Sequence, residues 1–171
     1  MRDEGTGTSI LLETERLFLR EMDRNDYDAL YRVLADTEIM RHYPYTFDEA
    51  RVRAWIERNM ERYRVNGFGL WAVCLKGSGE MIGDCGFTLQ TINGNELPEI
   101  GYHIRRDFQR RGYDQEAAKA VLDWVFRNTD YRRCTRIANT PMSLPSGQQN
   151  PLECIPTAII RMRQTGLHMC R

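Results

Sequence analysis

The sequence has no net charge, because 24 Lys and Arg residues balance 24 Asp and Glu residues in a chain of 171. Overall charge therefore indicates neither a nucleic-acid partner nor a cationic one. Long apolar runs are also missing, and the polar, Gly- and Thr-rich residues 1–8 lack the apolar core of a signal peptide. We expect a soluble, cytoplasmic protein with a disordered N-terminus at residues 1–8 and with neither a nucleic-acid nor a membrane partner.

Cysteines are few and poorly placed for cross-linking or for binding a metal. The five are odd in number and widely spaced: Cys74, Cys85, Cys134, Cys154 and Cys170. This spacing fits neither a disulfide framework nor a metal site, and it predicts reduced, mostly buried thiols. With 42% apolar residues, the chain is long enough for one well-filled core and too short for two ordinary domains.

Hydrophobic periodicity and turn residues predict alternating strands and helices. Asp26 and Asp48 each precede apolar residues at helical spacing, and Ala117, Val121 and Val125 form part of a later helical stripe. Short Gly- and Asn-containing turns predict that the middle strands form an antiparallel meander. The expected order is a strand at 10–22, two helices, strands at 70–75, 81–91 and 99–104, a helix at 112–127 and a strand at 133–138. This order predicts an α+β, sandwich-like fold with a mixed, mostly antiparallel central sheet flanked by helices.

The most informative segment joins the strand that ends at Ile104 to the helix that starts at Gly112. The first-turn amides of a helix lack intrahelical partners and lie at the positive end of its dipole, so they can bind a pyrophosphate. Gly112 permits a close approach of backbone and phosphate, and Arg110 and Arg111 add positive charge.

This segment resembles the acetyl-CoA signature of the GNAT superfamily, in which Gln or Arg is followed three residues later by Gly and then, two residues on, by Gly or Ala. Gln109 and Gly112 match. Asp114 departs from the pattern, because a carboxylate there would repel the phosphate unless it turned away or the neighbouring arginines offset it. Further segments resemble, in order, landmarks of the Rim-type ribosomal-protein N-acetyltransferase branch: 12–17, 19–20, 81–83, 99–102 and 115–117. The resemblance covers residues 9–140 and implies the GNAT acyl-CoA N-acyltransferase fold.

The resemblance implies acetyl-CoA as the cosubstrate and an amine as the acceptor, either a protein N-terminus or a small molecule. It places the pantetheine arm along the backbone of His103, Ile104 and Arg105, with the Ile104 amide as a donor to the oxyanion. The loop that would hold the pyrophosphate consists of Gln109, Arg110, Arg111, Gly112, Tyr113, Asp114 and Gln115. No metal site is expected.

Direct attack of an amine on a thioester needs a base, donors for the oxyanion and a proton for the leaving thiolate. Glu99 is the candidate base, acting through water; the alternative is a structural carboxylate paired with a neighbouring Arg. Tyr102 is the candidate proton donor, or else a packed core tyrosine. The His103 side chain is interpreted as a strand residue rather than an acid or base, because no partner is visible for it.

Four aromatic residues are candidates for the wall of the acceptor pocket. Tyr43 and Tyr45 lie in the loop between the first two helices, which covers that region in the family, and Phe68 and Trp71 could join them. Ordinary core packing is the alternative, and we prefer it for Trp71. The mixed Arg and Glu residues at 49–64 are interpreted as a solvated helix face rather than a nucleic-acid patch.

The sequence changes character after Asn139. Most of its prolines fall in an atypical tail at 141–171, where the periodicity supports only a short helix near 157–162. The closing helix and strands of the family are therefore expected to be missing. Their loss would leave the strand at 133–138 exposed and open to homodimerisation or aggregation.

A shift of the reading frame can explain this tail. Back-translating residues 141–171 and reading from the third base of each codon allows an uninterrupted peptide that contains AAESIGM, which is similar to the family's closing helix. Under this hypothesis we expect low or no activity. The alternative for the tail is a divergent segment that folds in its own way, alone or completed by a second chain. The alternative to the enzyme is a catalytically silent acyl-CoA-binding or dimerising GNAT-like protein with a frameshifted tail.

Overall fold

The computed structural model describes residues 9–41, 43–92, 95–131, 133–136 and 158–161. Within these residues the elements are β1 (Ile10–Glu13), β2 (Leu17–Arg20), η1 (Arg24–Asp26), α1 (Tyr27–Leu34), α2 (Glu49–Asn66), β3 (Leu70–Leu75), β4 (Met81–Ile92), β5 (Asn95–Ile104), η2 (Arg106–Phe108), α3 (Tyr113–Asn128), β6 (Arg133–Arg136) and β7 (Ala158–Arg161). The strands form one sheet in chain order, and every neighbouring pair is antiparallel except β5 and β6. The predicted mixed, mostly antiparallel sheet is confirmed.

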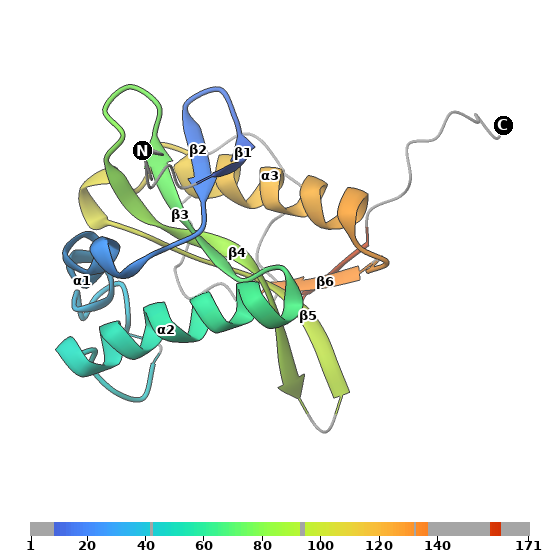
Figure 1. The fold of residues 1–171 in the computed structure, drawn as a ribbon, viewed down its shortest axis with the longest axis horizontal. Helices are drawn as coiled ribbons and strands as arrows, with labels where there is room; N and C mark the ends of the chain where they lie inside the picture. The colour runs from blue at the N-terminus through green and yellow to red at the C-terminus, as the bar shows by residue number, and fades with distance from the viewer. Residues whose placement is uncertain (1–8, 42, 93–94, 132, 137–157, 162–171) are drawn as a thin grey trace, which may run out of the picture.

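Helices cover both faces of this sheet (Figure 1). On one face, α1 and α2 pack over an apolar core that includes Leu30, Ile56 and Ala72. On the other face, α3 packs over a second core that includes Phe87 and Val121. The sheet therefore separates two apolar cores, which confirms that helices flank it.

The prediction of one strand at 10–22 is wrong, because the chain turns back at 14–16 and forms the β1–β2 hairpin. The Thr14 amide donates to the Leu17 carbonyl at 2.9 Å, and the Leu17 amide donates to the Thr14 hydroxyl at 2.9 Å. Glu116 of α3 accepts from the Arg16 amide at 2.9 Å. A carboxylate a hundred residues away thus helps to hold this turn, and local alternation cannot reveal it.

The starts of the first two long helices agree with prediction. The Asp48 side chain accepts from the Arg51 amide at 2.9 Å and caps α2, which ends at Gly67 in the left-handed region. Asp26 directly precedes α1, but its carboxylate makes a two-point ion pair with Arg20, at 2.6 and 2.8 Å, instead of capping that helix.

Part of the tail joins the sheet. Ala158–Arg161 is strand β7 and pairs antiparallel with β6, so the short helix predicted near 157–162 is wrong. The β-branched Ile159 and Ile160 favour extended backbone. Because β6 pairs with β5 on its other side, the exposed edge expected at 133–138 is not present over Arg133–Arg136. The expectations for residues 1–8 and for the rest of 141–171, including its reading frame, lie outside the described residues.

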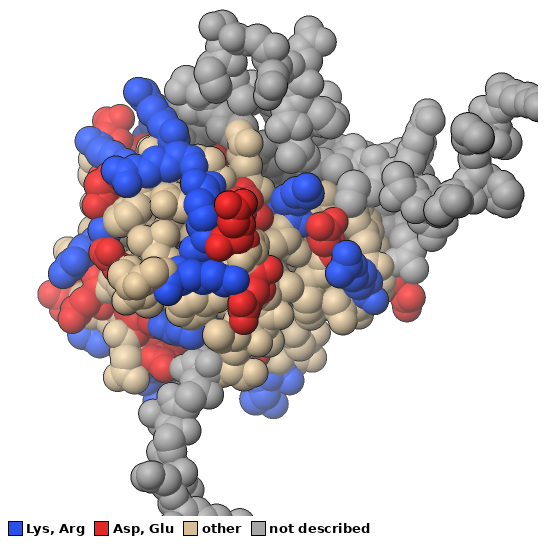
Figure 2. Space-filling view, turned by 90° about the horizontal axis from the view of Figure 1, so that it is seen from above, with Lys and Arg blue, Asp and Glu red and all other residues tan. Residues whose placement is uncertain are grey.

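The described part of the chain contains no helix that is both long and apolar enough to cross a membrane. It also contains no group of three or more His, Cys, Asp or Glu residues placed to hold a metal ion. Two free cysteines, Cys74 and Cys85, are buried, and burial raises the pKa of the Cys74 thiol to about 11. Basic and acidic side chains are interspersed on the face seen in Figure 2.

Candidate active site

The strands β4 and β5 carry different chemistry on their two faces. Side chains alternate along a strand, so the register places three pairs on one face: Asp84 with His103, Gly86 with Gly101, and Thr88 with Glu99. The intervening residues belong to the core under α3: Cys85, Phe87, Ile100, Tyr102 and Ile104. Polar side chains therefore gather between the sheet and α2.

A pocket of about 200 Å³ opens on this polar face. The loop before α2 and the helix itself supply Tyr43, Tyr45, Trp55, Arg58 and Arg62. The strands supply Leu70, Thr88, Gln90, Glu99, Gly101, Tyr102 and His103. The pocket thus brings the predicted base together with two of the four aromatic candidates and with charged residues of both signs.

Glu99 is 7% exposed, and its Oε2 atom has no hydrogen-bond partner among the described residues. Burial raises the pKa of its carboxyl, against the opposing effects of the Gln90 amide, Arg62 and His103. Within the described part of the chain Glu99 forms no ion pair with an arginine, which was the structural alternative. A buried carboxyl with a raised pKa and an unpartnered oxygen suits proton transfer with a bound molecule.

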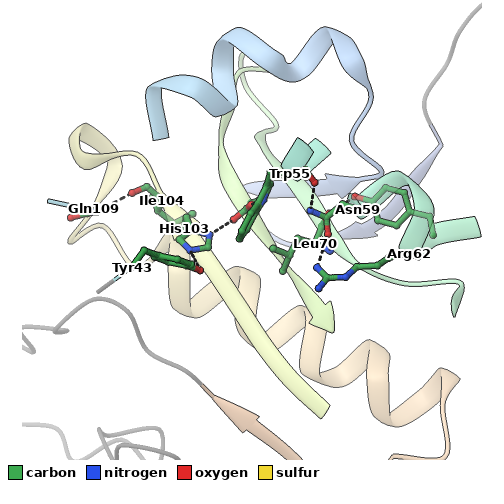
Figure 3. A network of polar contacts seen from close by, with 10 residues as sticks. Tyr43, Trp55, Asn59, Arg62, Leu70, His103, Ile104 and Gln109 are labelled. Carbon is green, nitrogen blue, oxygen red and sulfur yellow. Dashed lines mark hydrogen bonds and ion pairs between the residues drawn. The ribbon is translucent and has the colours of Figure 1, made fainter. Parts of the chain in front are cut away.

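His103 has a partner that the sequence analysis missed. Its Nδ1 lies 2.7 Å from Oδ1 of the fully buried Asp84, whose Oδ2 accepts from the Trp55 indole at 2.9 Å. When Asp84 is ionised it can only accept, and Nδ1 is then the donor. Nε2 faces the Tyr43 hydroxyl at 3.3 Å (Figure 3). The interpretation of His103 as a residue without a partner is therefore wrong, because it joins a polar chain from Trp55 to the pocket wall.

Close backbone packing also fixes the position of this strand pair. A Cβ added at Gly83 would lie 2.0 Å from the His103 carbonyl oxygen, and one added at Gly86 would lie 2.0 Å from the Gly69 carbonyl oxygen. Any side chain at these positions would force the backbone of β5 or β3 away from β4. The close approach of β4 to the His103 backbone therefore requires glycine at position 83.

Within the described residues, no strand pairs with Gly101–Ile104 of β5 on the side away from β4, and we call this the open side of β5. The described β6 pairs with β5 at Glu99 and Ile100, and the Arg105 amide donates to the Ile82 carbonyl at 2.8 Å, toward β4. Backbone groups alternate in direction along an antiparallel strand, so those of Ile104 face the open side. The Gln109 side chain donates to the Ile104 carbonyl at 2.8 Å (Figure 3).

This geometry changes the predicted contacts with the pantetheine arm. The Arg105 amide is already bonded to β4, and His103, two residues earlier, has the same backbone direction. Neither is placed to pair with a ligand on the open side. Of the three predicted backbone partners, Ile104 keeps an amide that faces this side.

The predicted phosphate loop leads into the start of α3. Gly112 has φ 77° and precedes the helix, and the Glu116 amide donates to its carbonyl at 3.0 Å. This is the first helical bond, so the amides of Tyr113 and Asp114 come before the intrahelical hydrogen bonds begin. They are the amides that the sequence analysis proposed for a pyrophosphate.

Three arginines belong to or contact this loop. Arg110 and Arg111 are exposed, and Arg110 adopts a positive φ of 61°. Arg16, from the β1–β2 turn, donates to the Arg111 carbonyl at 2.9 Å and lies 4.4 Å from the Tyr113 ring centroid. Glu116 holds Arg16 in place through a bond of 2.7 Å to its Nε. In the sequence, Arg16 stands out only as part of a family landmark.

Other predicted residues lie on the α3 side of the sheet. Tyr102 is 7% exposed and belongs to the core there, although it also borders the pocket. Phe68 and Trp71 belong to the same core, as preferred for Trp71. Tyr102 therefore packs as a core tyrosine, and its role as a proton donor stays a prediction.

Comparison with known proteins identifies the family. The family model described as an acetyltransferase (GNAT) domain matches residues 16–141. The uncharacterized protein YkkB of Bacillus subtilis (strain 168) is 35% identical over 121 residues, which cover 70% of each chain. The uncharacterized N-acetyltransferase p20 of Bacillus licheniformis is 30% identical over 125 residues, covering 71% of this chain and 69% of p20. The chain therefore belongs to the GNAT family, and we class it as an N-acetyltransferase.

Solved structures show the same fold. RimL, a ribosomal L7/L12 alpha-N-protein acetyltransferase solved in complex with coenzyme A, aligns with a TM-score of 0.60 and 21% identity, over 75% of this chain and 73% of RimL. At this level of identity the likeness shows the fold alone. The predicted GNAT fold is confirmed.

Proposed function

We propose that this chain transfers an acetyl group from acetyl-CoA to a primary amine by direct attack of the amine. The observation that carries the proposal is the buried Glu99, with its unpartnered oxygen and raised pKa, in a pocket beside the open end of β5. Family membership supports the reaction class, and the coenzyme A bound to RimL supports the cosubstrate.

Acetyl-CoA supplies an acetyl group that is activated as a thioester. We place its pyrophosphate on the loop 109–115, where the amides of Tyr113 and Asp114, which precede the first helical hydrogen bond, and the positive end of the α3 dipole favour an anion. The Ile104 amide faces the open side of β5 and is the proposed donor to the charge that develops on the thioester oxygen.

In the transfer, the amine nitrogen forms a bond to the acetyl carbon as the carbon–sulfur bond breaks. We propose that Glu99 receives the proton lost by the amine, through a water molecule, because its raised pKa makes it a stronger base than an exposed glutamate. The departing thiolate takes up a proton, for which Tyr102 is the candidate donor.

We assign His103 and Asp84 a positioning role. Asp84 fixes the orientation of the imidazole, and the imidazole in turn holds the Tyr43 hydroxyl at the pocket. Tyr43 also packs edge-on against Phe47 and Trp55, with ring centroids 5.5 and 6.3 Å apart. These contacts give the acceptor site a rigid aromatic wall.

A catalytically silent acyl-CoA-binding or dimerising protein is the second candidate. Asp114 favours it, because a carboxylate in the first turn of α3 competes with a phosphate for the helix dipole. Arg16, Arg110 and Arg111 oppose this effect by adding positive charge around the same loop. We therefore keep the enzyme as the first proposal, with a Rim-type ancestry and either a protein N-terminus or a small amine as acceptor.

An acetylation assay tests the proposal. The purified chain is incubated with acetyl-CoA and either peptides with free N-termini or small primary amines, while a thiol reagent measures the release of coenzyme A. We expect release that depends on the amine and on Glu99. Acetyl-CoA binding without release for any amine would favour the silent acyl-CoA-binding protein, and the absence of both would contradict the enzyme and the acyl-CoA-binding protein alike.

A further inference from the structure

The pocket contains two positive charges that the proposed reaction does not use. Arg58 and Arg62 lie four residues apart on α2, so they share one face of the helix, and both line the pocket that holds Glu99. Neither forms an ion pair within the described part of the chain. Arg62 donates to the neutral side chain of Asn59 at 3.3 Å, beside Leu70 (Figure 3).

Other arginines of the same helix have partners outside the pocket. Arg64 pairs with Glu61 at 2.5 Å, and Arg53 lies 4.1 Å from the centroid of the Tyr27 ring. Arg62, by contrast, is partly buried, and like charges one helical turn apart repel each other. Arg58 is exposed, and an anion bound between the two guanidinium groups would relieve their repulsion.

We propose that Arg58 and Arg62 form an anion subsite and that the acceptor is an amine which also carries a carboxylate or a phosphate. Guanidinium groups bind both anions through parallel, charge-assisted hydrogen bonds. The inference rests on the proposed acetyl transfer, because it places the amine of the acceptor at Glu99 and its anionic group at α2. Two guanidinium groups would repel di- and polyamines.

The charge pattern of the pocket supports this assignment. Arg62 is near enough to Glu99 to lower the pKa of that carboxyl, yet the two form no ion pair within the described residues. One pocket therefore offers separate positive and negative ends. A ligand with an ammonium at one end and an anion at the other satisfies both ends at once.

Calorimetric titration of matched small amines tests the subsite. The ligands are O-phosphoethanolamine and 3-aminopropanoate, which carry an anion, and ethanolamine and 1,2-diaminoethane, which do not. The proteins are the unmodified chain, Arg58→Gln, Arg62→Gln and the control Arg53→Gln, which lies on the same helix outside the pocket. Circular dichroism confirms that each variant is folded.

We expect at least one anionic amine to bind the unmodified chain and the control equally. Its affinity should fall roughly tenfold or more in each pocket variant, as expected for a lost charge-assisted hydrogen bond. The affinity of Arg62→Lys for this amine should lie between those of the unmodified chain and Arg62→Gln, because lysine keeps the charge but lacks the planar guanidinium group. Comparing the affinities of O-phosphoethanolamine and 3-aminopropanoate shows whether the subsite prefers a phosphate or a carboxylate.

Three results would overturn the subsite: no binding of either anionic amine, equal binding of ethanolamine or 1,2-diaminoethane, or unchanged affinity in both pocket variants. Acetyl-CoA is titrated into the same proteins as a separate readout. Binding of acetyl-CoA without an arginine-dependent anionic amine leaves the proposed function standing and rejects the subsite. The reverse result keeps the subsite and rejects acetyl transfer.

Discussion

The two faces of β4 and β5 are built from alternate residues of the same strands, yet they differ in their chemistry. The face toward α3 carries apolar side chains such as Phe87 and Ile100. The face toward α2 buries Asp84, Glu99 and His103 instead. Burying polar groups is costly unless they are paired, and Glu99 keeps an unpartnered oxygen. The α3 face therefore contributes to stability, whereas the α2 face buries polar groups around the pocket at a cost in stability.

The largest effect should come from Glu99→Gln on the α2 face. Removing the base should lower the rate of acetyl transfer by about 10²–10⁴-fold, while the affinity for acetyl-CoA stays the same. Steady-state release of coenzyme A and calorimetry measure the two quantities. An unchanged rate would show that Glu99 is not the base.

Substitutions on the α3 face should lower the free energy of unfolding. Phe87 is fully buried and packs against Phe68 at a centroid distance of 4.7 Å, so Phe87→Ala should lower the free energy of unfolding by about 3–5 kcal/mol. Its neighbour Thr88 faces α2, and Thr88→Ala should lower the free energy of unfolding by about 1 kcal/mol. Urea unfolding measures both, and equal losses would contradict the division between the faces.

A smaller effect is expected at the buried Asp84. In Asp84→Asn, one side-chain oxygen becomes an amide donor that cannot accept from Trp55 or His103, so the free energy of unfolding should fall by about 1–3 kcal/mol. Activity should fall as well, through the displaced His103. Urea unfolding measures this, and a variant as stable as the unmodified chain would show that the Trp55–Asp84–His103 hydrogen bonds do not stabilise the fold.

Gly101→Val probes the floor of the pocket. A Cβ there would meet Leu70 at 3.5 Å and the Glu99 carboxylate at 4.0 Å, which are ordinary contacts, so the fold should tolerate it. The branched side chain would occupy space in the pocket that we propose for the acceptor. The KM for the amine should rise about tenfold, equivalent to about 1.4 kcal/mol. A parallel loss of acetyl-CoA affinity would show that the pocket does not belong to the acceptor alone.

The smallest effect concerns pH. Burial raises the pKa of Glu99, so the folded chain keeps this proton to higher pH than the unfolded chain does. The resulting stability is present below the ordinary glutamate pKa, about 4.3, and is lost as pH rises through the raised value. Glu99→Gln should therefore be more stable than the unmodified chain at neutral pH, and the difference should disappear in acid. Urea unfolding across pH tests this, and a constant difference would contradict it.

Elements set by local signals could be predicted from the sequence. Strand β3 matches its predicted range of 70–75, α2 starts after Asp48, and α3 differs from its predicted range by one residue at each end. These boundaries depend on caps, turns and periodicity within a few residues. Strand β7 and the break between β1 and β2 depend on partners far along the chain, so the same signals missed them.

The Asp84–His103 pair was missed for a different reason, because its signal was present but was not used. Ile92 pairs with Asn95 across the short turn between β4 and β5. Each step outward moves back one residue in β4 and forward one in β5, so eight steps lead to Asp84 and His103. A lone acid in an apolar strand, opposite a histidine, was enough to suggest the pair. The orientation of Arg58 and Arg62 toward the pocket, by contrast, depends on how α2 packs.

Calorimetric titration of acetyl-CoA into the purified chain is the most informative single experiment. We expect saturable binding of one acetyl-CoA per chain, retained in Glu99→Gln and weakened when Arg111→Gln reduces the charge beside the start of α3. Absence of binding at millimolar acetyl-CoA would rule out the proposed transfer, because the loop 109–115 would then not hold the cosubstrate on which it depends.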